Sequence, residues 1–210
     1  MVNIYLIRHG KQNTELCNVD VELSNEGILQ AELLRDRLKN YKIDALYSSN
    51  LLRARQTAEI INQVLWLPIT IREAVKEISF GCLEGNSNEY NDIHFSDFMK
   101  EQLKLLEDIP YPGGENGAAV YERAMPVIRE LIQSGKNHIA VVTHGGVIRA
   151  LLAGLFGRDQ AGKYLFAYSL ENTSITQLIY EPEIDRFYLQ RFNDSAHLEG
   201  HKELHRKSQV

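Results

Sequence analysis

The stretch HIAVVTHGG, residues 138–146, is the most strand-like run in the chain and ends in a pair of glycines. A short, β-branched apolar run of this kind predicts a buried strand, and the glycines predict a turn into a helix over about 147–156. The stretch VNIYLIRHG at residues 2–10 has the same form, an apolar run closed by His and Gly. Both runs therefore predict buried strands, over residues 2–8 and 138–143, of the kind found in parallel sheets.

The rest of the chain alternates predicted strands with predicted helices. Strands separated by helices favour a parallel sheet with crossover connections, and the short turn before the last strand favours an antiparallel hairpin. The predicted fold class is therefore α/β: a mostly parallel sheet flanked by helices on both faces, with an antiparallel hairpin at its edge. The other strands are predicted over residues 43–48, 69–71, 174–180 and 186–192, and the other helices after Ser24 and over about 51–65, 86–108 and 116–134.

Three residues bear on the ends and continuity of these helices. Ser24 and Asn50 precede helical patterns and are predicted to cap them, because their side chains can accept a hydrogen bond from an unpaired backbone N–H. Pro126 falls inside the predicted helix 116–134, where a missing N–H donor is expected to kink or split it.

Composition narrows the class of protein. The chain has 210 residues, 44% of them hydrophobic, so it can fill a core. Its 23 basic and 28 acidic residues give a net charge of −5, and the body contains no basic run. A nucleic acid is therefore not an expected partner.

Membrane and disulfide classes are disfavoured as well. No apolar run approaches the ~18 residues of a membrane-spanning helix, and the first residues lack the pattern of a signal peptide, so no membrane partner is expected. Cys17 and Cys82 stand outside any CxxC pair and are interpreted as inert thiols. This usage argues against a disulfide scaffold and fits a reducing cytoplasm.

The end of the chain differs in composition from the body. Residues 1–195 are expected to form one domain and residues 196–210 a polar, frayed tail. His197, His201 and His205 have the spacing of a helical metal site. No carboxylate pattern accompanies them, so a solvated tail is the preferred interpretation and no metal site is predicted.

Reactive side chains gather where the predicted strands end, which is where ligands bind in open α/β sheets. Paired guanidinium groups suit phosphate oxygens, and a neutral imidazole can attack phosphorus. A second histidine can offset phosphoryl charge, and a carboxylic acid can protonate the leaving oxygen. The set predicts phosphoryl chemistry with cationic side chains in place of a metal. Its members are Arg8, His9, Arg53, Glu77 and His144.

Five motifs in order resemble the histidine phosphatase superfamily, which has the phosphoglycerate mutase-like fold. The Arg-His-Gly motif alone would be a weak signal of this family, but the five motifs together are specific. The resemblance covers about the first 195 residues. The motifs are LIRHG at 6–10, SSNLLRARQTAE at 48–59, EISFGCLEG at 77–85, PGGE at 112–115 and THGG at 143–146.

The resemblance implies a role for each candidate. His9 would be the phosphorylated nucleophile, and Glu77 would donate and later accept a proton. Arg55 is left on the surface by this matching, while Glu84 stays open as an alternative acid. The residues implied to bind the phosphoryl group are Arg8, Arg53, His144 and Gly145, with His144 also counted as catalytic.

The loop after the first motif departs from the family pattern. Relatives usually place Glu or Gln after Arg-His-Gly and an Asn five residues beyond that Gly, whereas this chain has Lys11 and Glu15 at those positions. Asn13 and Asn18 are both candidates for the lost polar contact. Lys11 is expected either to attract a second anionic group of the substrate or to point to water. A substrate loop containing Lys11, Asn13 and Glu15 is therefore predicted.

Two features favour a phosphatase over a mutase within the family. The stretch between Gly85 and Gly113 leaves room for one helix and no large lid, and Gly146 stands where mutases often carry Asn. We expect a metal-independent phosphomonoesterase, a histidine acid-type phosphatase without a cofactor, that acts on a small phosphorylated metabolite through phosphohistidine. The alternatives are a cofactor-dependent phosphoglycerate mutase and a non-catalytic binder of phosphorylated ligands. A homodimer stays open.

Overall fold

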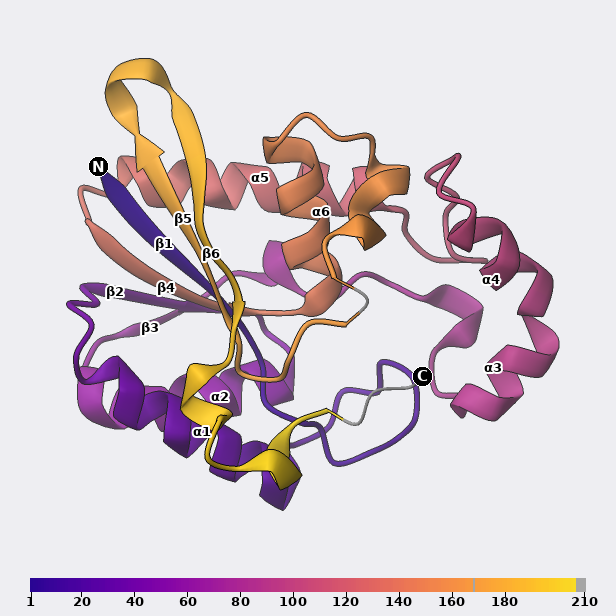
Figure 1. Ribbon diagram of the computed structural model, residues 1–210, viewed down its shortest axis with the longest axis horizontal. Helices are drawn as coiled ribbons and strands as arrows, with labels where there is room; N and C mark the ends of the chain where they lie inside the picture. The colour runs from indigo at the N-terminus through magenta and orange to yellow at the C-terminus, as the bar shows by residue number, and fades with distance from the viewer. Residues whose placement is uncertain (168, 207–210) are drawn as a thin grey trace.

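The computed structural model describes residues 1–167 and 169–206 (Figure 1). Across them runs one sheet in the order β3-β2-β4-β1-β5-β6. The first four strands in this order are parallel, β5 runs antiparallel to β1, and β6 runs antiparallel to β5. The predicted fold class is confirmed. The strands are β1 (Val2–Arg8), β2 (Ala45–Ser48), β3 (Ile69–Ile71), β4 (His138–Thr143), β5 (Ile175–Glu181) and β6 (Arg186–Asp194).

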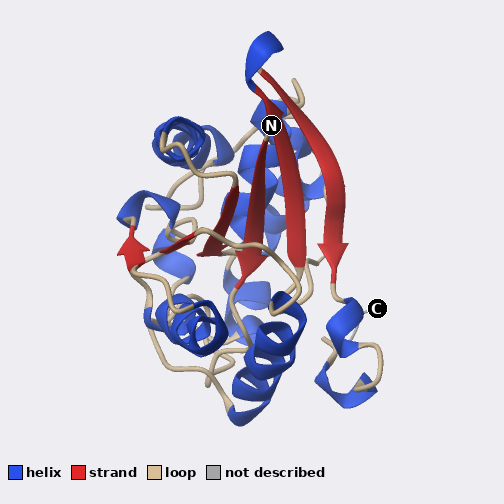
Figure 2. Ribbon diagram, turned by 90° about the vertical axis from the view of Figure 1, so that its left-hand side faces the viewer, coloured by secondary structure: helices blue, strands red, loops and turns tan. Residues whose placement is uncertain are grey.

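Helices cover the two faces of this sheet (Figures 1 and 2). One face buries α1 and α2 against it through Leu34 and Ile61, and the other buries α5 and α6 through Ile128 and Leu151. Alternate residues of β1 serve the two cores, as the period of a strand requires. The helices are α1 (Asn25–Leu38), α2 (Leu52–Leu65), α3 (Asn88–His94), α4 (Ser96–Leu103), α5 (Gly117–Gln133) and α6 (Gly145–Leu155).

The helix ends differ in part from the prediction. Ser24 caps α1 by accepting a hydrogen bond from the backbone N–H of Gly27. Asn50 does not cap α2, and that prediction was wrong: the first backbone N–H of α2, at Leu52, donates to Asp20 Oδ1 over 2.7 Å. A carboxylate from a distant loop thus takes the role that the sequence pattern assigned to the nearest Asn.

Pro126 does not split α5, which is continuous from 117 to 133. Pro126 and Glu122, whose carbonyl loses its helical donor, both lie on the exposed side of the helix. Water can satisfy that carbonyl, so the helix tolerates the proline. The stretch 86–108 forms two short helices, α3 and α4, rather than a single one.

The C-terminal segment, which we define as residues 196–206, packs on the body, so the expectation of a frayed tail was wrong for it. It contains 3₁₀ turns over Ala196–Leu198 and Lys202–Leu204. Leu198 is fully buried, and the carbonyl of Leu204 accepts a 2.6 Å hydrogen bond from the buried amide of Gln30. Two leucines in a polar run suffice to anchor it, because burial of each is worth about 2 kcal/mol. The remainder of the predicted tail, 207–210, lies outside the described residues.

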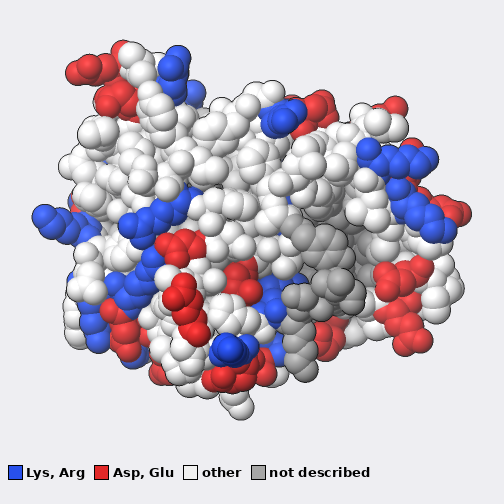
Figure 3. Space-filling model, in the orientation of Figure 1, with Lys and Arg blue, Asp and Glu red and all other residues white. Residues whose placement is uncertain are grey.

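The described residues contain no helix long and apolar enough to cross a bilayer. Over the face drawn in Figure 3, acidic and basic side chains are interspersed, so no band of one sign covers that face.

Candidate active site

Two histidines meet at the carboxyl ends of the neighbouring parallel strands β1 and β4. The register pairs Arg8 with Thr143, so His9 and His144 follow side by side, with ring centroids 4.9 Å apart. The first turn of α2 brings Arg53 to the same place. His9, His144 and Arg53 are 4%, 0% and 1% exposed. The structure therefore brings the predicted phosphoryl-binding residues together in a buried cluster.

The His9 ring is held in one tautomer. Its Nδ1 lies 2.7 Å from the carbonyl oxygen of Gly10, which can only accept, so Nδ1 carries the proton. Nε2 keeps its lone pair and accepts a hydrogen bond from Arg53 Nε over 3.3 Å. Burial, with the charges of Arg53 and Arg8, holds the pKa of His9 well below its ordinary value. At neutral pH Nε2 is therefore an unprotonated nucleophile.

His144 also keeps one ring nitrogen without a hydrogen-bond partner among the described residues. Its Nε2 lies 2.7 Å from the hydroxyl of Ser49, which already accepts from the N–H of Leu51 and can donate to the ring. Burial and the neighbouring His9 and arginines hold the pKa of His144 well below its ordinary value, so the ring is neutral. With Ser49 donating to Nε2, the ring proton sits on Nδ1, which has no partner among the described residues.

Arg8 supplies a second unsatisfied donor. One of its terminal nitrogens donates to the carbonyl of Leu170, while its buried Nε has no hydrogen-bond partner among the described residues. Burial lowers the pKa of Arg8 to about 9, which still leaves the guanidinium charged at neutral pH. Buried donors are rarely left unpaired. Arg8 Nε and His144 Nδ1 are therefore suited to the oxygens of a bound phosphoryl group.

Of the two asparagines that the sequence left open, Asn18 contacts Arg53 of the buried cluster. Its Oδ1 accepts from Arg53 over 2.7 Å, and its amide nitrogen donates to Glu84 over 2.9 Å. Asn13 is exposed, and its backbone N–H pairs with the carbonyl of Glu22. Asn18 has a positive φ of 48°, a conformation that asparagine tolerates better than most residues.

The other predicted residues of this loop lie away from the reacting groups. The ammonium of Lys11 pairs with the carboxylate of Glu26 in the first turn of α1. Glu15 is exposed. Neither Lys11, Asn13 nor Glu15 belongs to the residues that line the cleft beside Arg8. The structure therefore does not place these three residues of the predicted substrate loop in the cleft.

Glu77 and Glu84 occupy different environments. Glu77 lines the cleft beside Arg8, and its Oε1 accepts 2.9 Å hydrogen bonds from the backbone N–H groups of Ile78 and Gly146. Glu84 instead accepts from Asn18 and from the N–H of Phe80, so it ties two loops together. Of the two carboxylates, Glu77 lines the cleft and Glu84 does not.

Gly146 makes room for the Glu77 carboxylate. A Cβ at this position would lie 2.5 Å from Glu77 Oε1 and 2.7 Å from a methyl carbon of Ile78. Any side chain would therefore displace the carboxylate. The glycine that distinguishes this motif from that of many mutases is thus required by the placement of the Glu77 carboxylate.

The PGGE motif supports the backbone that carries Glu77. The Glu115 carboxylate accepts from the backbone N–H of Ser79 over 2.8 Å and pairs with Arg123 over 2.7 Å. Arg123 in turn donates to the carbonyls of Ala74 and Glu77. This ion pair holds both ends of the segment 74–79. Sequence reasoning recognised the motif and missed this role.

A cleft of about 350 Å³ extends from Arg8 and Glu77. Three further charged residues line this cleft: Arg149 on α6, Lys163, and Arg206 of the C-terminal segment. Sequence reasoning missed them because none lies in a family motif.

Among residues 1–167 and 169–206, no three His, Cys, Asp or Glu side chains are grouped to hold a metal ion. His197 instead bonds Thr173, and His205 bonds the carbonyl of Leu198.

Comparison with known proteins places this geometry among phosphatases. The model of the histidine phosphatase superfamily (branch 1) matches residues 4–195. The chain is 29% identical to the uncharacterized phosphatase PhoE of Bacillus subtilis, over 95% of this chain and 98% of that protein. It is 31% identical to a metal-independent phosphoserine phosphatase of Arabidopsis thaliana, over 80% of this chain and 74% of the relative.

A solved structure agrees with these relatives. A mycobacterial glucosyl-3-phosphoglycerate phosphatase, in complex with inorganic phosphate, superposes with a TM-score of 0.84 at 25% identity, over 94% of this chain and 99% of that one. A phosphoglycerate mutase also occurs among the relatives.

Proposed function

The chain belongs to the histidine phosphatase superfamily, and from this membership we propose that it hydrolyses phosphomonoesters of small metabolites through a phosphohistidine on His9. The observation that carries the proposal is the unprotonated Nε2 of His9, which accepts from Arg53 Nε and belongs to a ring 4.9 Å from that of His144. The partnerless buried donors of the neighbouring Arg8 and His144 support the proposal, because they could bind the oxygens of a phosphoryl group.

In the first step the lone pair of His9 Nε2 forms a bond to phosphorus, and the bond from phosphorus to the ester oxygen breaks. Glu77 gives its proton to that oxygen, so an alcohol leaves. The charge on the phosphoryl oxygens is balanced by Arg8 and Arg53, with a hydrogen bond from His144 Nδ1. In this step Glu77 is the proton donor of the histidine acid-type phosphatase that we propose.

In the second step water attacks phosphorus, and its proton passes to the Glu77 carboxylate. The bond from phosphorus to Nε2 breaks, and its electron pair returns to the imidazole, which releases inorganic phosphate. The cleft beside Glu77 gives water a route to the intermediate.

The two unpaired cysteines, Cys17 and Cys82, fit a reducing compartment.

The experiment is hydrolysis of p-nitrophenyl phosphate by the full chain in EDTA. Turnover that survives EDTA supports the proposal, since Arg8 and Arg53 supply the positive charge and His144 supplies a hydrogen-bond donor. Activity that returns only with added Mg²⁺ or Zn²⁺ contradicts it. Tight phosphate binding with no turnover of any phosphoester would favour the non-catalytic binder.

The mutase alternative has less support. The stretch between Gly85 and Gly113 holds the short helices α3 and α4, and Gly146 is packed against Glu77. Incubation with 3-phosphoglycerate and 2,3-bisphosphoglycerate tests the alternative directly. Release of inorganic phosphate without 2-phosphoglycerate is the expected result.

A further inference from the structure

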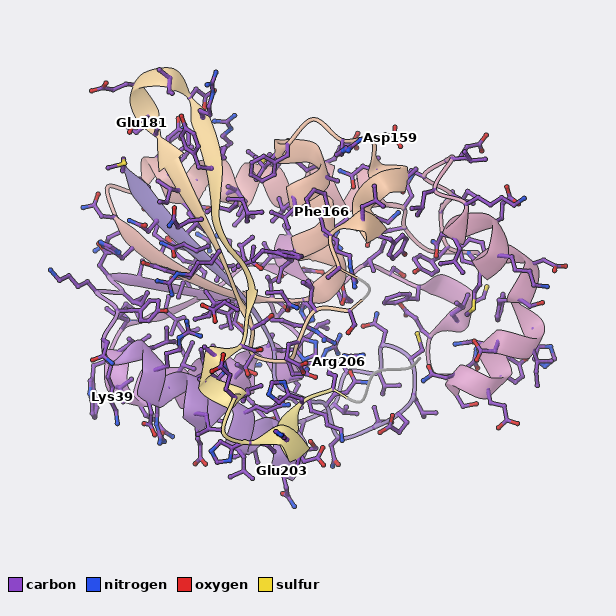
Figure 4. All side chains as sticks on the ribbon, in the orientation of Figure 1. Lys39, Asp159, Phe166, Glu181, Glu203 and Arg206 are labelled. Atoms are coloured by element: carbon purple, nitrogen blue, oxygen red, sulfur yellow. The ribbon has the colours of Figure 1, made fainter. Side chains whose placement is uncertain are left out.

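The C-terminal segment delivers a cation to the cleft although it lies beyond residue 195, where the family match ends. Arg206 lines the cleft together with Arg8 and Glu77. In Figure 4 the labelled Arg206 lies nearer the middle of the molecule than Glu203 of the same segment. The family match therefore does not cover Arg206, and only its contacts bear on its role.

A single loop fixes Arg206 relative to the nucleophile. Glu171 Oε1 accepts the backbone N–H of Arg206 over 2.8 Å. On one side of Glu171, the carbonyl of Leu170 accepts from Arg8. On the other side, the amide of Asn172 donates to the carbonyl of His9 over 3.0 Å. Three consecutive residues thus hold Arg206, Arg8 and His9 in one arrangement.

The backbone of Arg206 is anchored, but its guanidinium has no ion-pair partner among the described residues. The neighbouring Lys163 differs, because its ammonium is neutralised by Asp108 over 2.7 Å in a buried pair. After burial, the charge of Arg206 is the next contributor to the lowered pKa of Arg8. The cleft therefore carries more positive charge than the phosphoryl site alone.

We propose that Arg206 binds a carboxylate on the leaving-group side of the substrate, so that the preferred substrates are small phosphomonoesters of hydroxycarboxylic acids. This inference rests on the proposed phosphatase function. A guanidinium pairs with a carboxylate through two parallel hydrogen bonds, and its single charge matches that group. The cleft volume of about 350 Å³ restricts the partner to a small molecule.

The test compares two substrates that differ only in the carboxylate. In 3-phosphoglycerate a carboxylate stands where glycerol 3-phosphate has a hydroxymethyl group. The wild type should prefer 3-phosphoglycerate. Arg206→Gln should lower kcat/KM for 3-phosphoglycerate by about 10- to 100-fold, mainly through KM, because a hydrogen bond to a charged group is worth about 1.5–3 kcal/mol. For glycerol 3-phosphate the change should stay within about twofold.

Two further variants make the result specific. Arg206→Lys keeps the charge without the planar fork and should fall between wild type and Arg206→Gln. Lys202→Gln removes an exposed cation from the same segment and should leave both substrates unchanged. Thermal unfolding of each variant should match that of the wild type.

Three outcomes overturn the proposal: no wild-type preference for 3-phosphoglycerate, an equal loss on both substrates in Arg206→Gln, or the same loss in Lys202→Gln. Each of these leaves phosphate release intact in the wild type. Failure of the proposed function would differ, since the wild type would then hydrolyse neither ester.

Discussion

The candidate site has two ends that are built in different ways: a phosphoryl end, which is the buried cluster around His9, and a leaving-group end, which is the cleft that extends from Arg8 and Glu77. At the phosphoryl end, His9, His144 and Arg53 are buried. His9 directly follows β1 and His144 directly follows β4, while Arg53 lies in the first turn of α2, the helix after β2.

At the leaving-group end three charged residues come from three separate elements. Arg149 lies on α6, Lys163 on a 3₁₀ turn over Gln160–Leu165, and Arg206 on the C-terminal segment.

From this difference we expect the phosphoryl end to determine the chemistry and the leaving-group end to determine substrate selectivity. The phosphoryl end is fixed by the parallel sheet, because neighbouring strands must deliver their carboxyl ends to one edge. The leaving-group end depends on segments that can change without disturbing that edge. Substitutions at the first end should therefore affect every substrate, and those at the second end should affect some substrates only.

The largest expected effect is that of His9→Ala, which removes the nucleophile. Turnover should fall by at least about 10⁴-fold on all phosphomonoesters alike, since loss of a covalent nucleophile costs that much in comparable systems. Steady-state kinetics on p-nitrophenyl phosphate and 3-phosphoglycerate measure it. Substantial activity of His9→Ala on either substrate would mean that the phosphoryl end has been misidentified.

Glu77→Gln should show an effect that depends on the leaving group, because Glu77 stands between the two ends. An amide keeps the shape but cannot give a proton, and general acid catalysis is worth about 10²–10⁴-fold. The loss should be of this size for glycerol 3-phosphate and small for p-nitrophenyl phosphate. Glu84→Gln is the matched control. A leaving-group dependence in Glu84→Gln instead would move the acid role to that residue.

The pH dependence of stability tests how His197 helps to anchor the C-terminal segment that carries Arg206. Burial lowers the pKa of His197 to about 4, so the folded chain keeps the ring neutral where the unfolded chain, with an ordinary pKa near 6.5, binds a proton. Stability should therefore fall as pH drops from about 6.5 toward 4.

Urea unfolding of the wild type and His197→Gln at pH 7 and pH 5 measures this contribution. The variant should lose less stability than the wild type over this interval. His9 and His144 contribute in the same direction, so both proteins keep a residual slope. Identical slopes in the two proteins would show that His197 takes up its proton without opposing the fold.

Lys11→Gln should have the smallest effect. The Lys11 ammonium pairs with Glu26 at the surface, with both side chains about half exposed, and such pairs contribute about 0–1 kcal/mol. KM for 3-phosphoglycerate and for glycerol 3-phosphate should change by less than about twofold. A selective rise in KM for 3-phosphoglycerate would place the second anion site at Lys11 rather than at Arg206.

The sequence predicts the strands that lead to the phosphoryl end for a physical reason. Buried strands leave continuous apolar runs, so β1, β3 and β4 have the predicted bounds, and the residues after them share one edge. Contacts between distant segments leave no such pattern. Asp20 capping α2 and Glu171 holding Arg206 both join loops far apart in the chain, and neither follows from local periodicity.

The C-terminal segment shows the same limit. Its polarity predicts a solvated tail, whereas Leu198 and Leu204 anchor it and Gln30 fixes its backbone. Only the tertiary fold shows that a pocket receives these leucines. Lys11 is the converse case, since a cation next to the Arg-His-Gly motif pairs with Glu26 instead of facing the cleft.

The central claim is a covalent phosphohistidine on His9. Its most direct test is rapid quenching of the wild type during turnover of a substrate labelled with ³²P, followed by mass mapping of the labelled peptide. The account predicts a phosphate on the peptide containing His9, stable in base, labile in acid and absent from His9→Ala. An acid-stable label on another residue, or full turnover by the wild type with no trapped label and undiminished activity in His9→Ala, would contradict it.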